Sequence, residues 1–327
     1  MKSSRLRVVI TGASSGIGAA TAVAFARQGC QLVLGARGRA GLDDIANRCR
    51  AAGGSAQVRE VDVTDAAAVA AFAAEARSIL GTIDLWFSDV GIGVVGKYGG
   101  VPIADHQQVI AANLISHMND AHAVLPIFQQ QGHGIWVNMI SLGGYITAPW
   151  AAAYTASKFG LRGFSAALRG ELHGELHGQP RIHICDVYPT FVATPAIGHA
   201  GNYTGARLGW PPGAIAPEKV ADAVVRLARH PRATTVVGMP AALLKLGALA
   251  NPVSALLMSR FMESWSKRAD PAPDTTGTMY APPAAPSGID DPRRHPAAQR
   301  HTALAVGTVV LAAAIGAALR GGKPIKR

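Results

Sequence analysis

The stretch "TGASSGIG" at residues 11–18 decides the fold. It follows the β-branched run "RLRVVIT" and precedes an Ala-rich helical stretch. Gly12 permits a tight turn, Gly16 lets the backbone approach a pyrophosphate, and Gly18 allows close helix packing. The start of the helix offers N–H donors and a partial positive charge to phosphate groups. A glycine triplet alone would be weak evidence, but this spacing between a strand and a helix predicts a dinucleotide-binding turn.

The chain up to residue 239 continues this alternation of strands and helices. Strand-like runs lie at 5–11, 31–36, 56–63, 83–89, 134–141, 181–188 and 234–239. Helical stretches lie between them at 19–28, 42–52, 66–80, 105–131, 151–177 and 217–230. The order predicts an α/β Rossmann fold, a doubly wound parallel sheet of about seven strands with helices on both faces. Such a sheet binds its ligand at the carboxyl ends of the strands.

The second strand ends in "LGARGR", where an NAD-specific site places a carboxylate for the ribose 2′-OH. Here Ala36 takes that place and Arg37 follows, and a guanidinium can bind a 2′-phosphate with two donors. This predicts NADP(H) rather than NAD(H), although Arg37 could instead be a solvated residue at a helix start. Asp62 closes the third strand, where it could accept from an adenine amine. Its alternative role is a helix N-cap, which Asp65 or Thr64 fits better.

The stretch "YTASK" carries the chemistry. Tyr154 and Lys158 are four residues apart on a helix and therefore share one face. A free phenol has a pKa near ~10, and an ammonium one turn away, with a cationic nicotinamide, would stabilise its anion. Ser141 ends a strand, from which its hydroxyl can bond the substrate oxygen that Tyr154 protonates. Asn113, in "VIAANLISH", would complete a polar relay behind the lysine.

With these motifs in order, residues 5 to 239 resemble the short-chain dehydrogenase/reductase family. The resemblance implies a homo-oligomer that binds a nicotinamide coenzyme and holds no metal. It implies catalytic roles for Asn113, Ser141, Tyr154 and Lys158. It implies coenzyme contacts at Gly12, Ser14, Ser15, Gly16, Ile17, Gly18, Arg37, Asp62, Val63, Tyr154, Lys158 and Thr194.

Two motifs depart from the family pattern. "SDVG" at 88–91 stands where the family usually shows Asn-Asn-Ala-Gly, so Asp89 replaces an amide beside the path of the adenosine ribose. "YPTFVATP" resembles the family's Pro-Gly-x-Val-x-Thr-Pro, with Thr190 in place of the glycine. Asp89 is the one sequence feature that favours a coenzyme-binding protein without turnover.

Composition excludes several classes of protein. The net charge is +11, yet aromatic residues make up 6% and no basic run is interleaved with aromatics, so nucleic-acid binding is not expected. The widely spaced Cys30, Cys49 and Cys185 predict thiols in a reducing compartment. The N-terminus shows no signal-peptide pattern, which predicts a cytosolic catalytic domain. His173 and His177 are four residues apart and could form a metal pair, but the intervening glutamate lacks the spacing of H-E-x-x-H, so no metal site is expected.

The domains are expected at 1–265 (catalytic), 266–300 (Pro-rich linker) and 301–327 (apolar helix with a basic tail). As a helix the uncharged stretch 302–319 would measure about 27 Å, close to a ~30 Å hydrocarbon core. We expect it to anchor the protein to a membrane; the alternative is a helix docked on a partner subunit. The apolar stretch 239–262 could face lipid, cover the substrate or contact a subunit.

The predicted function is an NADPH-dependent oxidoreductase that interconverts a carbonyl and a primary or secondary alcohol, with Tyr154 as general acid/base. The Gly- and Pro-rich loop 190–216, with Phe191, Tyr203 and Trp210, should cover an apolar substrate. Steroids, retinoids, long-chain keto-lipids and xenobiotic ketones all fit this description. The alternative function is a membrane-tethered dinucleotide-binding protein that turns nothing over.

Overall fold

A computed structural model describes residues 5–175, 181–209, 213–244 and 251–290 of the chain. Within this part the main sheet has seven parallel strands in the order β3-β2-β1-β4-β6-β7-β9. Its strands are β1 (Arg7–Thr11), β2 (Gln31–Ala36), β3 (Ser55–Glu60), β4 (Leu85–Ser88), β6 (Gly134–Met139), β7 (Ile182–Pro189) and β9 (Thr234–Val237). The order reverses between β1 and β4, so the doubly wound Rossmann sheet predicted from the sequence is confirmed.

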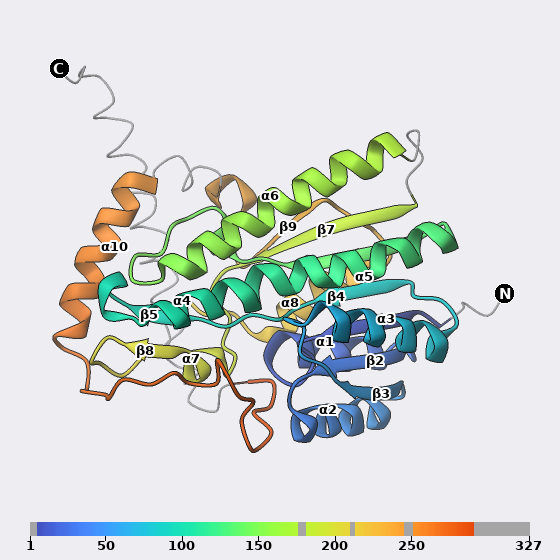
Figure 1. The fold of residues 1–327 in the computed structure, drawn as a ribbon, viewed down its shortest axis with the longest axis horizontal. Coiled ribbons are helices and arrows are strands. Elements are labelled where there is room, and N and C mark those ends of the chain that lie inside the picture. Colours follow the sequence, from blue (N-terminus) through green and yellow to red (C-terminus); the bar gives the residue numbers. More distant parts are fainter. Residues whose placement is uncertain (1–4, 176–180, 210–212, 245–250, 291–327) are drawn as a thin grey trace.

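Helices cover both faces of this sheet (Figure 1). One layer is α1 (Gly16–Ala26), α2 (Arg39–Ala51) and α8 (Pro217–Leu227), whose buried residues share one apolar cluster with the strands. The other layer is α3 (Ala66–Leu80), α5 (Ser116–Gln131) and α6 (Ala152–Glu175). Successive residues of β1 enter opposite layers: Val8 and Ile10 pack in the first cluster, and Val9 packs in the second. A parallel sheet buried on both faces therefore needs continuous apolar strands.

The predicted helix 105–131 is divided in the structure. It consists of α4 (Ile103–Ile110), a π-helical turn η2 (Ala111–Ile115) and α5. Two short strands, β5 (Val94–Gly96) and β8 (Gly201–Tyr203), pair in parallel and were not predicted. The remaining described elements are η1 (Tyr98–Gly100), η3 (Leu142–Gly144), α7 (Ala196–His199) and α10 (Asn251–Ser266).

Residues 270–290, predicted to be part of a linker, pack against the domain instead (Figure 1, orange). Thr275 and Asn202 exchange backbone hydrogen bonds of 2.8 and 3.0 Å, and the side chain of Met279 is fully buried. Composition alone does not reveal this packing, because a segment that is too polar to form a core of its own can still contribute side chains to a neighbouring core. The apolar stretch 302–319 lies outside the described residues, among which no helix is long and apolar enough to cross a membrane.

Candidate active site

The glycine-rich turn joins β1 to α1 at the carboxyl edge of the sheet. The N–H of Gly12 donates to the Gly35 carbonyl at 2.9 Å, and the residue has a φ of +79°. A Cβ on Gly12 would lie 2.7 Å from the Asp89 carbonyl oxygen, and one on Gly18 would lie 2.9 Å from the Gly12 carbonyl carbon. A Cβ on Gly16 would lie 3.2 Å from the Thr194 side chain. The fold therefore brings Thr194 beside the turn.

Ser141, Tyr154 and Lys158 come together at the same edge. Ser141 follows β6 with a φ of 144°, a region that side chains rarely adopt and that marks functional sites. Its hydroxyl accepts from the Gly143 N–H at 3.1 Å and shares a hydrogen bond with the Tyr154 phenol. One turn along α6, the Lys158 ammonium lies 5.8 Å from the centre of the Tyr154 ring and donates to the Met139 carbonyl at 3.2 Å.

The pKa values of this cluster depend mainly on burial. Burial raises the pKa of Tyr154, and the hydrogen bond from Ser141 only partly opposes it. From the sequence, the nearby ammonium was predicted to have the larger influence on the pKa of this phenol. Burial also lowers the pKa of Lys158 to about 8, against the opposing charge of Asp89. At neutral pH the phenol is protonated and most of the lysine is charged, the state that a proton donor requires.

Asn113 lies in the π-helical turn and is fully buried. Its side-chain amide donates to the Ile92 carbonyl at 2.9 Å and accepts from the Ile92 N–H at 2.8 Å. A Cβ on Gly91 would lie 3.8 Å from the Lys158 ammonium and 3.9 Å from the Asn113 side-chain oxygen. Asn113 thus fixes the loop that covers the lysine, and π-helical turns are frequent at functional sites.

Asp89 directs its carboxylate at the first turn of α1, where it accepts from the Gly18 N–H. Burial raises the pKa of this carboxyl well above its usual value, and the Lys158 charge and the Gly18 hydrogen bond oppose that rise. Asp89 in turn raises the pKa of Lys158. The departure from the family pattern therefore places a carboxyl group between the glycine-rich turn and the lysine.

Two residues predicted to read the adenosine end make other contacts in this structure. The Arg37 guanidinium donates to the backbone carbonyls of Met279 and Thr278 at 3.0 and 2.9 Å. Asp62 accepts from the backbone N–H and hydroxyl of Thr64 at 3.0 and 2.7 Å. Asp65 is the N-cap of α3, as the sequence argument favoured.

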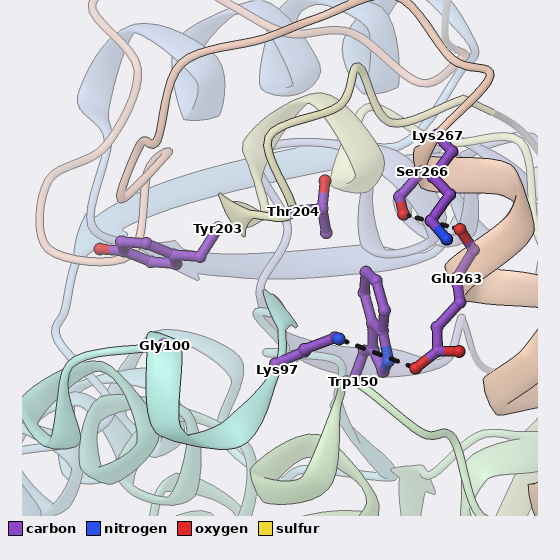
Figure 2. Close-up of a pocket in the computed structure, with 8 residues that line it drawn as sticks. All are labelled: Lys97, Gly100, Trp150, Tyr203, Thr204, Glu263, Ser266 and Lys267. Atoms are coloured by element: carbon purple, nitrogen blue, oxygen red, sulfur yellow. Dashed lines mark hydrogen bonds and ion pairs between the residues drawn. The ribbon is translucent and has the colours of Figure 1, made fainter.

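A surface cavity of about 490 Å³ lies between α10, β8 and the loop before α6 (Figure 2). Its lining residues are Lys97, Gly100, Trp150, Tyr203, Thr204, Glu263, Ser266 and Lys267. The Lys97 ammonium lies 3.7 Å from the Glu263 carboxylate and 5.6 Å from the centre of the Trp150 ring. Trp150 comes four residues before Tyr154, so the cavity adjoins the start of α6, the helix that carries Tyr154 and Lys158. Tyr203 and Thr204 come from the loop predicted to cover the substrate.

Comparison with known proteins decides the family. The model of the short chain dehydrogenases matches residues 7–202. This chain belongs to that family. The dehydrogenase is 30% identical to the ketoacyl reductase HetN of Nostoc sp. over 230 residues, which cover 70% of this chain and 77% of HetN.

Solved structures agree with this assignment. A metagenomic short-chain oxidoreductase in complex with NADP is 30% identical to the dehydrogenase, with a TM-score of 0.60 over 72% of this chain and 98% of that one. A short-chain dehydrogenase/reductase from Burkholderia phymatum in complex with NAD shares the fold, with 22% identity and a TM-score of 0.65 over 84% and 99% of the chains. The chain is an oxidoreductase of the type that acts on CH–OH groups and uses a nicotinamide dinucleotide.

Two buried polar residues that were not predicted from the sequence brace the site of the dehydrogenase. Asp120 accepts from the hydroxyls of Thr11 and Ser88 at 2.6 and 2.7 Å, which ties together the ends of β1 and β4. Burial raises the pKa of Asp120 to about 6. His117 Nε2 lies 2.8 Å from the Val90 carbonyl oxygen, and burial lowers its pKa to about 4, so the ring is neutral. Both residues lie on α5. The sequence signal that could have identified them is the presence of polar residues on a helix that was expected to be buried.

No group of three His, Cys, Asp or Glu side chains in the described part of the dehydrogenase could hold a metal ion. The side chains of His173 and His177, the pair considered in the sequence, lie outside the described residues. Cys30, Cys49 and Cys185 are free and buried.

Proposed function

We propose that this dehydrogenase uses NADPH to interconvert a carbonyl and a primary or secondary alcohol on a lipophilic substrate. The observation that carries the proposal is the cluster of Ser141, Tyr154 and Lys158, with a hydrogen bond between the first two and the ammonium beside the phenol ring. This intact set favours turnover over the alternative of a coenzyme-binding protein without activity. The test follows NADPH absorbance with a panel of steroid, retinoid, keto-acyl and small xenobiotic carbonyls.

Each residue of the cluster has a separate task in the reduction. A bound nicotinamide would supply the hydride. The Tyr154 hydroxyl donates its proton to the carbonyl oxygen, and the Ser141 hydroxyl donates a hydrogen bond to that same oxygen. The Lys158 charge stabilises the phenolate that remains after proton transfer. Asn113 holds the loop at Ile92 against the lysine and so keeps the ammonium in place.

We expect NADPH to bind at least about tenfold more tightly than NADH, because a charge-assisted contact contributes about 1.5–3 kcal/mol. The 2′-phosphate would replace the two carbonyls that Arg37 now binds. Titration of both coenzymes against wild type and Arg37→Ala measures this, and the variant should lose the preference. Arg39→Ala is the matched control, because Arg39 is exposed and paired with Asp43 at 2.9 Å. Equal affinities of the wild type for the two coenzymes would contradict the assignment.

A lipophilic substrate is supported by exposed apolar side chains on α10, a helix that lines the cavity with other residues, and on the loop 190–216. Leu256, Leu257 and Phe261 of α10 are exposed, as is Phe191 in the loop 190–216. Such side chains can receive the apolar part of a substrate whose carbonyl reaches Tyr154. Because the Nostoc relative is named a ketoacyl reductase, keto-acyl compounds are the first carbonyl compounds to test.

We further propose that residues 302–319 anchor the enzyme to a membrane, with the catalytic domain in the cytosol, and that the enzyme is a homo-oligomer. The support is the uncharged composition of this stretch, flanked by cations on both sides. Full-length protein should sediment with membranes, and a chain ended at Pro296 should remain in the supernatant. A full-length protein that is extracted without detergent would assign the stretch to a subunit contact instead.

A further inference from the structure

Residues 275–290, here called the strap, follow α10 and cross the carboxyl edge of the sheet. The strap begins with the hydrogen bonds between Thr275 and Asn202, and the N–H of Thr278 then donates to the His199 carbonyl at 2.9 Å. In Figure 1 this part of the orange segment runs beside β8 and α7 and turns close to α2. The strap therefore joins the substrate loop to the dinucleotide-binding half of the domain.

The strap is held closed by a cluster of two phenols and one carboxylate. Tyr280 donates from its hydroxyl to one oxygen of Asp105 at 2.6 Å, and Tyr203 donates to the other oxygen. Asp105 is 3% exposed, so its carboxylate depends on these donors for solvation. The hydrogen bonds to Asp105 raise the pKa of both tyrosines to about 12, which keeps the donors protonated at physiological pH.

Next to this cluster, Met279 brings the strap close to Tyr154. Its side chain is fully buried in an apolar cluster with Val94, Val109 and Ala153, against which Tyr154 also packs. Its carbonyl accepts from the Gln108 side chain at 3.3 Å as well as from Arg37. The strap thus fills space beside the residue that is proposed to protonate the substrate.

The strap also binds the two groups that a phosphorylated dinucleotide needs. Arg37, the proposed ligand of the 2′-phosphate, donates to two strap carbonyls at 3.0 and 2.9 Å. The N–H of Gly16, which opens α1 and belongs to the phosphate-binding turn, donates to the Gly288 carbonyl at 3.0 Å. An N–H that already has an acceptor is not available to a phosphate oxygen. The strap and the coenzyme therefore compete for the same donors at two phosphate-binding positions of the site.

We infer that the strap is an autoinhibitory segment that occupies the phosphate sites of the coenzyme and is displaced when the coenzyme binds. The inference rests on the proposed function, because that function assigns these donors to NADPH. The apparent affinity for the coenzyme is then the intrinsic affinity multiplied by the fraction of molecules with the strap open. Locking the strap weakens binding, and loosening the strap strengthens it.

A reversible lock tests the first half of this inference. A Cβ on Gly38 would lie 3.0 Å from the Cβ of Pro282, close to the roughly 3.5–4.5 Å that a disulfide spans. The double variant Gly38→Cys, Pro282→Cys, made in the full chain, is oxidised and titrated with NADPH by fluorescence. Its affinity should fall at least about tenfold on oxidation and return on reduction with dithiothreitol. Each single-cysteine variant, treated in the same way, is the control for the substitutions themselves.

Loosening the strap tests the second half. Tyr280→Phe removes one hydrogen bond to Asp105 and should tighten NADPH binding by about threefold or more. Tyr98→Phe is the matched control, since Tyr98 is 61% exposed and lies outside the strap. An oxidised double variant that binds NADPH as tightly as its reduced form would overturn the inference, as would tighter binding in the locked form. If the NADPH affinity of the double variant falls on oxidation and returns on reduction, but no carbonyl is reduced, only the proposed function is rejected. If NADPH binds to no form of the protein, both the inference and the proposed function are rejected.

Discussion

Replacing Tyr154 by Phe should lower the rate of carbonyl reduction by at least ~10²-fold, the usual effect of losing a general acid. The phenol hydroxyl is the proton donor of the proposed mechanism, and its raised pKa keeps it protonated at neutral pH. Phe retains the ring that packs beside Val94 and Met279, so the fold should be unchanged. The measurement is the turnover number with a substrate found in the carbonyl panel, together with NADPH affinity, which should persist.

The pH dependence of the wild type provides an independent check on the same cluster. Lys158 has a pKa lowered to about 8. Its cation predominates below that pH and is lost as the pH rises through it, so the rate of reduction should decline there. Tyr98→Phe, the control, should match the wild type in the rate of carbonyl reduction and in the pH dependence of that rate. A Tyr154→Phe enzyme that reduces carbonyls at a near wild-type rate would remove Tyr154 from the mechanism.

The sheet and the linear motifs were predictable because short-range patterns determine them. The glycine spacing at 11–18 requires a tight turn between strand and helix, and the alternation of apolar runs with Ala-rich stretches requires a parallel sheet. Tyr154 and Lys158 share a helix, so their relative placement follows from helical geometry. Ser141 joins them because the end of β6 and the start of α6 lie at the same edge of the sheet.

Features that depend on distant contacts were not predictable in this way. The π-helical turn carries Asn113, whose side chain binds the backbone of Ile92 on another segment of the chain. The pKa of Tyr154 is raised by burial that only the folded chain creates. The strap has the composition of a linker, and its order comes from partners such as Asp105 and Arg37 on other elements. Composition describes what a segment can bury by itself, and tertiary contacts decide the rest.

The glycine-rich turn leads to the second large expected effect. Gly18→Ala should lower the free energy of unfolding by about 1–3 kcal/mol, the usual cost of overpacking a filled site. The added Cβ would lie 2.9 Å from the Gly12 carbonyl carbon and 3.0 Å from a carboxylate oxygen of Asp89. The first neighbour is backbone and cannot rotate away, so the turn must shift. A shifted turn misplaces the first N–H groups of α1, and NADPH affinity should fall together with stability.

Gly163→Ala is the matched control for this substitution. Gly163 lies inside α6, and a Cβ there would meet nothing within 4 Å. An alanine in an exposed helix interior should stabilise the protein by roughly 0.5–1 kcal/mol, because glycine loses more backbone entropy on folding. Urea denaturation and NADPH titration of both variants separate the two effects. If Gly18→Ala unfolds like Gly163→Ala and binds NADPH like the wild type, the close approach of α1 to Gly12 cannot be what places the phosphate-binding donors.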